Sequence, residues 1–189
     1  MSREKILAAV KQNKPAPVPL PEMLSFAYPV TDLTAAFTAA ITKAGGATNI
    51  VKKGQPLTPA IKALFPDAQR IADFIEGDTT TNAALLQQPA LLDVVVLKGQ
   101  LGVAENGAIW VTDKDCVERV LPFITQHLVL VIDQPTLVGN MHQAYAVMGQ
   151  QNPDYGVFIA GPSKTADIEQ SLVIGAHGPR SMQVFIVEP

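Results

Sequence analysis

The stretch "IAGPSKTADIEQ", residues 159–170, contains the residue types of a turn that binds an anion. Gly161 allows backbone angles that other residues avoid, so a strand could turn sharply there into a helix. Ser163 or Thr165 could cap this helix, and Lys164 would add positive charge beside its free backbone N–H groups. These donors could bind a phosphate or a carboxylate.

The same stretch also fits a structural turn without a ligand. Asp167 and Glu169 would place negative charge in the first helical turn and would themselves satisfy the helix dipole. The glycine spacing of a phosphate-binding P-loop is absent. The residues alone leave a ligand site and a capped connection as alternatives.

A second polar loop, "GAHGPR" at residues 175–180, follows closely along the chain. His177 beside a Gly-Pro turn, with Arg180 behind it, suits acid–base chemistry or the binding of a carboxylate. The alternative is a histidine that hydrogen-bonds only to the backbone of its own loop. Because so few residues separate the two loops, we expect them to share one edge of a sheet.

Glu105 is a lone carboxylate among apolar residues in "LGVAENGAIWV". It could lie in water at the tip of a hairpin, since Asn106-Gly107 favours a tight turn. It could instead lie in a cleft that raises its pKa, where it would be a candidate catalytic residue.

Metal binding is not indicated. His127 and His142 show no metal-ligand spacing, and Cys116 is the one cysteine, so a disulfide or a cysteine-held cluster within this chain is excluded. Cys116 stands near Asp115 and Glu118, whose charges would raise the pKa of its thiol. We therefore expect this thiol to be unreactive.

The scaffold for these residues is predicted to be an α/β domain over residues 31–189. Helical patterns alternate with apolar strands such as "LVLVI" and "GVFIA" that lack polar alternation. Strands of this kind are buried on both faces, which indicates a mainly parallel, Rossmann-like sheet covered by helices on both sides. The "AENG" turn adds an antiparallel hairpin excursion.

Residues 1–30 are predicted to form a separate N-terminal segment. A helix over residues 2–13, capped by Ser2, precedes an extended arm rich in proline. This arm could contact another copy of the chain in a homo-oligomer, or it could be an ordered linker on its own domain.

Charge and composition narrow the classes of partner. The 14 basic and 17 acidic residues give a net charge of −3, which provides no electrostatic basis for binding nucleic acid or an anionic membrane. The N-terminus lacks the apolar core of a signal peptide, and the longest apolar runs are too short to span a bilayer. We expect a cytoplasmic protein.

Taken together, "LGVAENG", "GPSKTADIE", "GAHGP" and the final strand "MQVFIVE" resemble the LutC/YkgG family, the lactate utilization protein C-type proteins that carry a LUD domain. The resemblance covers roughly residues 30–189 and is most specific from Gly161 to Pro179. Two features differ from the family pattern: Asn106 replaces the usual Thr or Ser, and residues 113–122 depart from the usual sequence.

The resemblance implies a fold of the NagB/RpiA/CoA transferase-like class and a role in oxidising L-lactate to pyruvate. It implies iron–sulfur partners (LutA- and LutB-like), and because this chain has one cysteine, the clusters would reside in them rather than here. If the chain is catalytic, it would act as part of such a complex. In this interpretation a small carboxylate, phosphorylated ligand or nucleotide binds at Gly161, Ser163, Lys164, Thr165 and Arg180, with Glu105 and His177 as catalytic candidates.

Two other functions stay open. The Glu-Asn-Gly at residues 105–107 is also similar to that of class I CoA transferases, whose glutamate forms an acyl thioester, so Glu105 could be the nucleophile of an acyl or CoA transferase-like enzyme. Alternatively, the chain is a non-catalytic structural or regulatory subunit, and its motifs determine only the fold.

Overall fold

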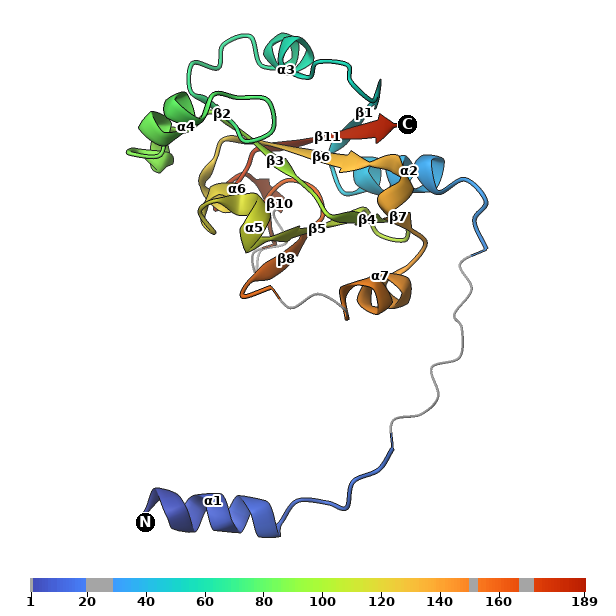
Figure 1. Cartoon of the computed structure of the whole chain (residues 1–189), viewed down its shortest axis with the longest axis vertical. Helices are drawn as coiled ribbons and strands as arrows, with labels where there is room; N and C mark the ends of the chain where they lie inside the picture. Colours follow the sequence, from blue (N-terminus) through green and yellow to red (C-terminus); the bar gives the residue numbers. More distant parts are fainter. Residues whose placement is uncertain (1, 20–28, 150–152, 167–171) are drawn as a thin grey trace.

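The computed structural model describes residues 2–19, 29–149, 153–166 and 172–189. Within these residues, the centre of the fold is a parallel sheet with strand order β1-β11-β6-β3-β2 (Figure 1). All its neighbouring strands pair in parallel, which confirms the predicted sheet type. The strands are β1 (Ala47–Lys52), β2 (Ile71–Asp73), β3 (Val94–Lys98), β6 (His127–Asp133) and β11 (Ser181–Glu188).

Both faces of the parallel sheet are covered. On one face, Val95 belongs to a core shared with helix α2 (Leu33–Lys43). On the other face, its neighbour Val94 belongs to a core shared with helix α3 (Thr58–Leu64). Successive residues of a strand point to opposite faces of the sheet. Because both faces are covered, Val94 and Val95 are both fully buried, and the strand shows no alternation of polar and apolar residues.

Helix α2 begins after the capping residue Asp32 and ends just before a pair of glycines. The Asp32 carboxylate accepts a hydrogen bond from the Ala35 N–H at 2.9 Å and caps the first turn. Phe37 and Ile41, one turn apart, are fully buried against the sheet. Gly45, with φ of +87°, follows the last turn and lets the chain reverse into β1.

A second sheet has the strand order β7-β4-β5-β8. Its strands are β4 (Leu101–Val103), β5 (Ala108–Thr112), β7 (Leu137–Val138) and β8 (Gly156–Ile159). β4 and β5 form the predicted antiparallel hairpin. Helix α7 (Met141–Met148) packs on this sheet through Ala144.

The prediction that "GVFIA" is a buried strand of the parallel sheet is wrong. It forms β8, which pairs antiparallel with β5 at the edge of the second sheet, and its residues are half-buried. An edge strand needs only one covered flank, so an apolar run alone did not distinguish it from a central strand.

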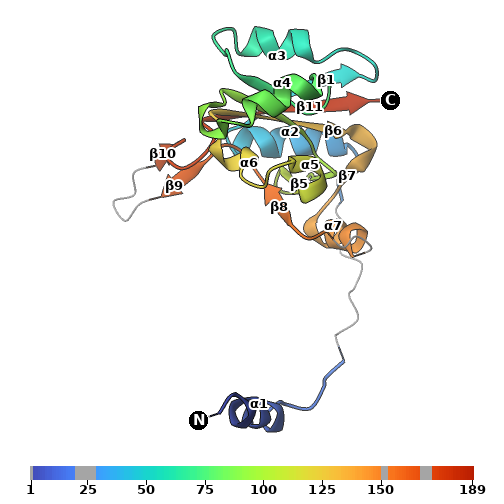
Figure 2. The same ribbon diagram turned by 60° about the vertical axis from the view of Figure 1, so that its left-hand side comes forward.

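Short helical elements lie between the strands. α4 (Thr79–Leu85) and η1 (Pro89–Leu91) join β2 to β3 within the parallel sheet, whereas α5 (Asp113–Cys116), α6 (Leu121–Ile124) and η2 (Gln134–Thr136) lie in the connections between the two sheets. A further pair of strands, β9 (Lys164–Ala166) and β10 (Leu172–Ile174), projects from the body of the domain (Figure 2).

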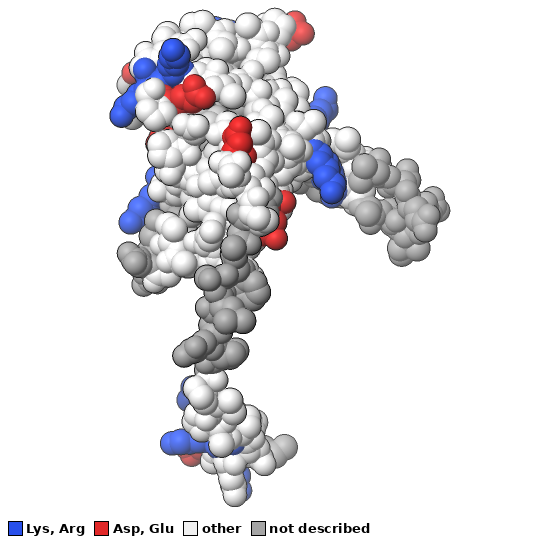
Figure 3. All heavy atoms as spheres, turned by 90° about the vertical axis from the view of Figure 1, so that its right-hand side faces the viewer, with Lys and Arg blue, Asp and Glu red and all other residues white. Residues whose placement is uncertain are grey.

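The N-terminal helix α1 (Arg3–Gln12) begins at Ser2, whose hydroxyl caps it, as predicted. All residues from Ser2 to Pro19 are exposed, and α1 lies clear of the sheets (Figure 1). Figure 3 shows basic side chains gathered on α1, while the charged side chains on the side of the domain turned toward the viewer are scattered.

No helix in the described ranges combines the length and apolar character that crossing a membrane requires.

Candidate functional site

The two polar loops meet at the edge of the parallel sheet where β6 and β11 begin. The Ser163 N–H donates to the Pro179 carbonyl at 2.9 Å, and the Ser163 carbonyl accepts from the Gly175 N–H at 2.9 Å. The Arg180 N–H donates to the carbonyl of Gln126, just before β6, at 2.8 Å. The expectation that both loops share one sheet edge is confirmed.

The predicted helix after Gly161 is wrong in the part that the structure describes. Lys164–Ala166 form strand β9, in which Thr165 pairs with Val173 of β10. The strand pairing engages backbone groups that a helix N-terminus would leave free. The free backbone N–H groups predicted for a helix N-terminus are therefore not present at Lys164–Ala166. Asp167 and Glu169 lie outside the described residues.

Two glycines of this region allow a close approach between segments. Gly161 has φ of +78°, and a side chain there would overlap the carbonyl oxygen of Ala44 at the end of α2. A Cβ on Gly178 would lie 3.0 Å from the Cβ of Ser163. Packing alone therefore accounts for these glycines.

The two basic side chains of this edge lie against different elements. Lys164 is exposed, and its side chain lies beside Gly45 at the C-terminal end of α2. A Cβ added to Gly45 would lie 3.5 Å from the Lys164 Nζ. A positive charge there interacts favourably with the carbonyl end of the helix. Arg180 lines a hollow together with the last residue of α3, the segment 65–68 that follows it, and η1. Of the predicted binding residues, only Arg180 lines this hollow, while His177 is exposed and Thr165 half-buried.

The hollow beside Arg180 has a volume of about 760 Å³. Its polar lining includes Asp67, Asp93, Gln126, His127, Ser181 and Gln183, and its apolar lining includes Leu64, Phe65 and Leu91. Across the described residues, the Arg180 guanidinium makes no ion pair or side-chain hydrogen bond. We name this feature the Arg180 hollow.

His127 is held rigidly in this lining. Its Nδ1 lies 2.8 Å from the Ser181 hydroxyl, and its ring lies 4.8 Å from the ring of Phe65. Burial lowers the pKa of His127, the nearby Arg180 lowers it further, and Asp93 partly opposes both. The imidazole is therefore held toward its neutral form. His127 was not among the predicted site residues, because it was considered only as a metal ligand and the spacing of the histidines does not fit a metal site.

Glu105 lies at the hairpin tip, away from the Arg180 hollow. It is exposed, and its carboxylate accepts a hydrogen bond from the Met141 N–H, the first residue of α7, at 3.1 Å. The Asn106 side chain accepts from the Ala108 N–H at 2.9 Å and closes the turn. Glu105 also borders a shallow hollow beside Lys43. Of the two predicted environments, the exposed hairpin tip is the one observed.

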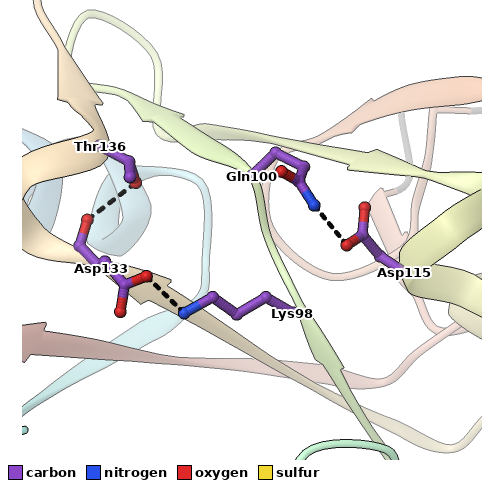
Figure 4. Close-up of polar contacts among 5 residues, drawn as sticks. All are labelled: Lys98, Gln100, Asp115, Asp133 and Thr136. Atoms are coloured by element: carbon purple, nitrogen blue, oxygen red, sulfur yellow. Dashed lines mark hydrogen bonds and ion pairs between the residues drawn. The ribbon is translucent and has the colours of Figure 1, made fainter. Parts of the chain in front are cut away.

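A polar group that sequence reasoning missed lies at the opposite, carboxyl end of the parallel strands (Figure 4). Lys98, the last residue of β3, pairs with Asp133, the last residue of β6, at 2.6 Å. Thr136 donates to the Asp133 carbonyl, and Gln100 donates to Asp115. The Lys98 and Asp133 side chains are 39% and 48% exposed, so this is a solvated ion pair between adjacent strands.

Cys116 is fully buried, and burial, followed by the charges of Asp115 and Asp113, raises the pKa of its thiol to about 11. The predicted direction is confirmed, although burial contributes more than the neighbouring acids do. In the described ranges, no group of three His, Cys, Asp or Glu side chains is arranged to hold a metal ion.

A crystal structure of a DUF162 family protein from Deinococcus radiodurans is similar in fold, with a TM-score of 0.61 and 19% identity. The similarity covers 82% of this chain and 96% of that one. It supports the predicted α/β fold.

Curated relatives carry the name lactate utilization protein C. The protein from Anoxybacillus flavithermus is 36% identical over 116 residues, covering 61% of this chain and 53% of the relative. Those from Bacillus pumilus and Shouchella clausii are 33% and 29% identical, covering 55% and 59% of this chain and 45% and 51% of the relatives. The chain thus spans about half the length of these relatives. A model of the LUD domain matches residues 34–187, and the chain belongs to the LUD domain family.

Proposed function

We propose that this chain is a LutC-like component of an L-lactate utilization system, in which it acts with iron–sulfur partner proteins and binds a small organic anion. Membership of the LUD domain family and the names of the curated relatives support the lactate role. The single cysteine, buried and with a raised pKa, supports the assignment of cluster chemistry to partners.

The observation that carries the anion site is the position of Arg180. This residue ends the "GAHGPR" loop, and its backbone joins that loop to the start of β6. Its guanidinium borders an open hollow and has no protein anion paired with it in the described ranges. A guanidinium that is free to form paired hydrogen bonds is suited to a carboxylate or a phosphate.

Growth of a deletion strain tests the lactate role. We expect a strain that lacks this chain to fail on L-lactate as sole carbon source while growing normally on glucose. Complementation with the unaltered chain should restore growth. Normal growth of the deletion strain on L-lactate, with no second LUD protein in the genome, would refute the lactate role.

Affinity purification of the tagged chain from lactate-grown cells tests the partners. We expect iron–sulfur proteins to co-purify, identified by mass spectrometry and by the visible absorbance of their clusters. Purification of the chain without any such protein under mild salt would contradict the proposed assembly.

A further inference from the structure

We infer that the Arg180 hollow binds an organic oxyanion that carries a planar ring, of about the size of a nucleoside monophosphate. This inference deepens the anion site proposed above and rests on it for the role of Arg180. It does not depend on the lactate role, because binding can be measured on the isolated chain.

The lining of the hollow contains one basic side chain, Arg180, and two carboxylates, Asp67 and Asp93. The Asp93 carboxylate is already engaged, since it accepts hydrogen bonds from the N–H groups of Gln69 and Arg70 at 2.8 and 2.9 Å. Asp67 is exposed to solvent, where water screens its charge. Arg180 therefore contributes the positive charge of the lining without a protein partner in the described part of the chain.

The stem of Arg180 is held in place by its neighbours. A Cβ on Gly175 would lie 2.7 Å from the Cγ of Arg180, so the absence of a side chain at Gly175 leaves the room in which this stem lies. The backbone N–H of Arg180 is fixed by Gln126. The start of the side chain is thus fixed, and only its guanidinium end has to be ordered when it binds an oxyanion.

A ring-bearing ligand is favoured by the aromatic side chains of the lining, which we call the aromatic wall. Phe65 and His127 lie with their ring centroids 4.8 Å apart and their planes 31° apart, and both line the hollow. Because the pKa of His127 is lowered, its imidazole offers a largely uncharged surface at neutral pH. Leu64 and Leu91, 40% and 56% exposed, extend the apolar rim and would be covered by a bound ring.

The size of the hollow argues against a three-carbon acid as its ligand. Its volume of about 760 Å³ falls within the usual range for sites that bind ligands of drug or nucleotide size. Lactate or pyruvate could bind Arg180 but has no ring to stack on Phe65 and His127. A ligand that spans both features gains the charge-assisted hydrogen bonds and the stacking together.

Isothermal titration calorimetry on the full chain tests the inference with four probes: AMP, phenyl phosphate, inorganic phosphate and L-lactate. We expect AMP and phenyl phosphate to bind at least tenfold more tightly than inorganic phosphate and L-lactate, because only they reach the rings. Equal affinities for all four probes, or no binding of the two ring-bearing probes, would overturn the inference.

Two substitutions locate the site. Arg180→Gln should weaken AMP binding about tenfold to hundredfold, whereas Arg119→Gln should leave it unchanged. Arg119 is a matched control because it is an exposed arginine that lies over Tyr155, 5.3 Å from the ring centroid, and outside the hollow. If Arg180→Gln does not fold, Arg180→Lys keeps the charge but loses the planar fork, and should still weaken AMP at least severalfold. Unchanged affinity in a folded Arg180 variant would overturn the inference.

The aromatic wall has its own variant. Phe65→Leu keeps an apolar side chain but removes the ring, so AMP and phenyl phosphate should weaken about tenfold while inorganic phosphate is unaffected. Equal weakening of all three would refute stacking on this wall. A deletion strain that grows on L-lactate while AMP binding shows the expected pattern would refute the lactate role and leave this site standing.

Discussion

Substitution of Gly161 by alanine tests whether the turn at the sheet edge is required for the fold. Gly161 has φ of +78°, and an added Cβ would overlap the carbonyl oxygen of Ala44. The backbone of residues 161–163 would have to move away from the end of α2, which would disturb the contacts that join the two loops.

The magnitude follows from two separate costs. A left-handed conformation costs an alanine about 1–2 kcal/mol relative to glycine. Forcing a methyl group into a closely packed space costs about 1–3 kcal/mol more. Gly54→Ala is the matched control, because Gly54 has a similar φ of +84° but nothing within 4 Å of the added Cβ. Gly54→Ala should show only the first cost.

Urea unfolding followed by the fluorescence of Trp110 measures both variants. Trp110 is the one tryptophan of the sequence and is buried in the folded chain, so its emission reports on unfolding. With a slope of about 2 kcal/mol per molar urea, the midpoint of Gly161→Ala should fall about 0.5–1.5 M below that of Gly54→Ala. Equal midpoints would refute the close approach of Gly161 to α2.

Three further predictions concern titrating groups. Cys116, with its pKa raised to about 11, should react with iodoacetamide at pH 8 only after unfolding in urea, and rapid labelling of the native chain would contradict its burial. Burial raises the pKa of Glu76, but hydrogen bonds from the Leu57 and Thr58 N–H groups and the Thr58 hydroxyl outweigh this effect and hold the pKa below its ordinary value. Stability from Glu76 is thus present above the unfolded pKa and lost as the pH falls through the folded pKa, so Glu76→Gln should show a weaker loss of stability in acid urea titrations. An unchanged acid profile would count against this. Arg180→Gln should raise the pKa of His127, because the charge of Arg180 is one cause of its lowering. NMR titration of the His127 ring protons measures this pKa, and an unchanged value would show that the charge of Arg180 does not act on His127.

The parallel sheet could be predicted because burial on both faces leaves a clear pattern in the sequence. β3 and β6 are apolar at nearly every position, and the Asn106-Gly107 turn predicted the hairpin between β4 and β5. The edge strand β8 was assigned to the wrong sheet because its three apolar residues after Gly156 resemble those of a central strand. Strand length and composition do not encode which neighbour a strand pairs with.

The site was predicted in part. Proximity of the two loops followed from their short separation in the chain, and it is observed through Ser163 and Pro179. A helix after Gly161 was predicted from cap residues, yet the same Ser and Thr residues also suit a short strand, and pairing with β10 decided the outcome. The Arg180 hollow could not be predicted, because residues 64–68, 90–93 and 126–127, which line it with Arg180, are far from Arg180 in the sequence.

A crystal structure of the chain with AMP would locate the anion site. We expect phosphate oxygens within hydrogen-bond distance of the Arg180 guanidinium and the base against Phe65 and His127. Phosphate bound instead at Lys164 or beside Glu105, with the Arg180 hollow filled only by water, would contradict this expectation.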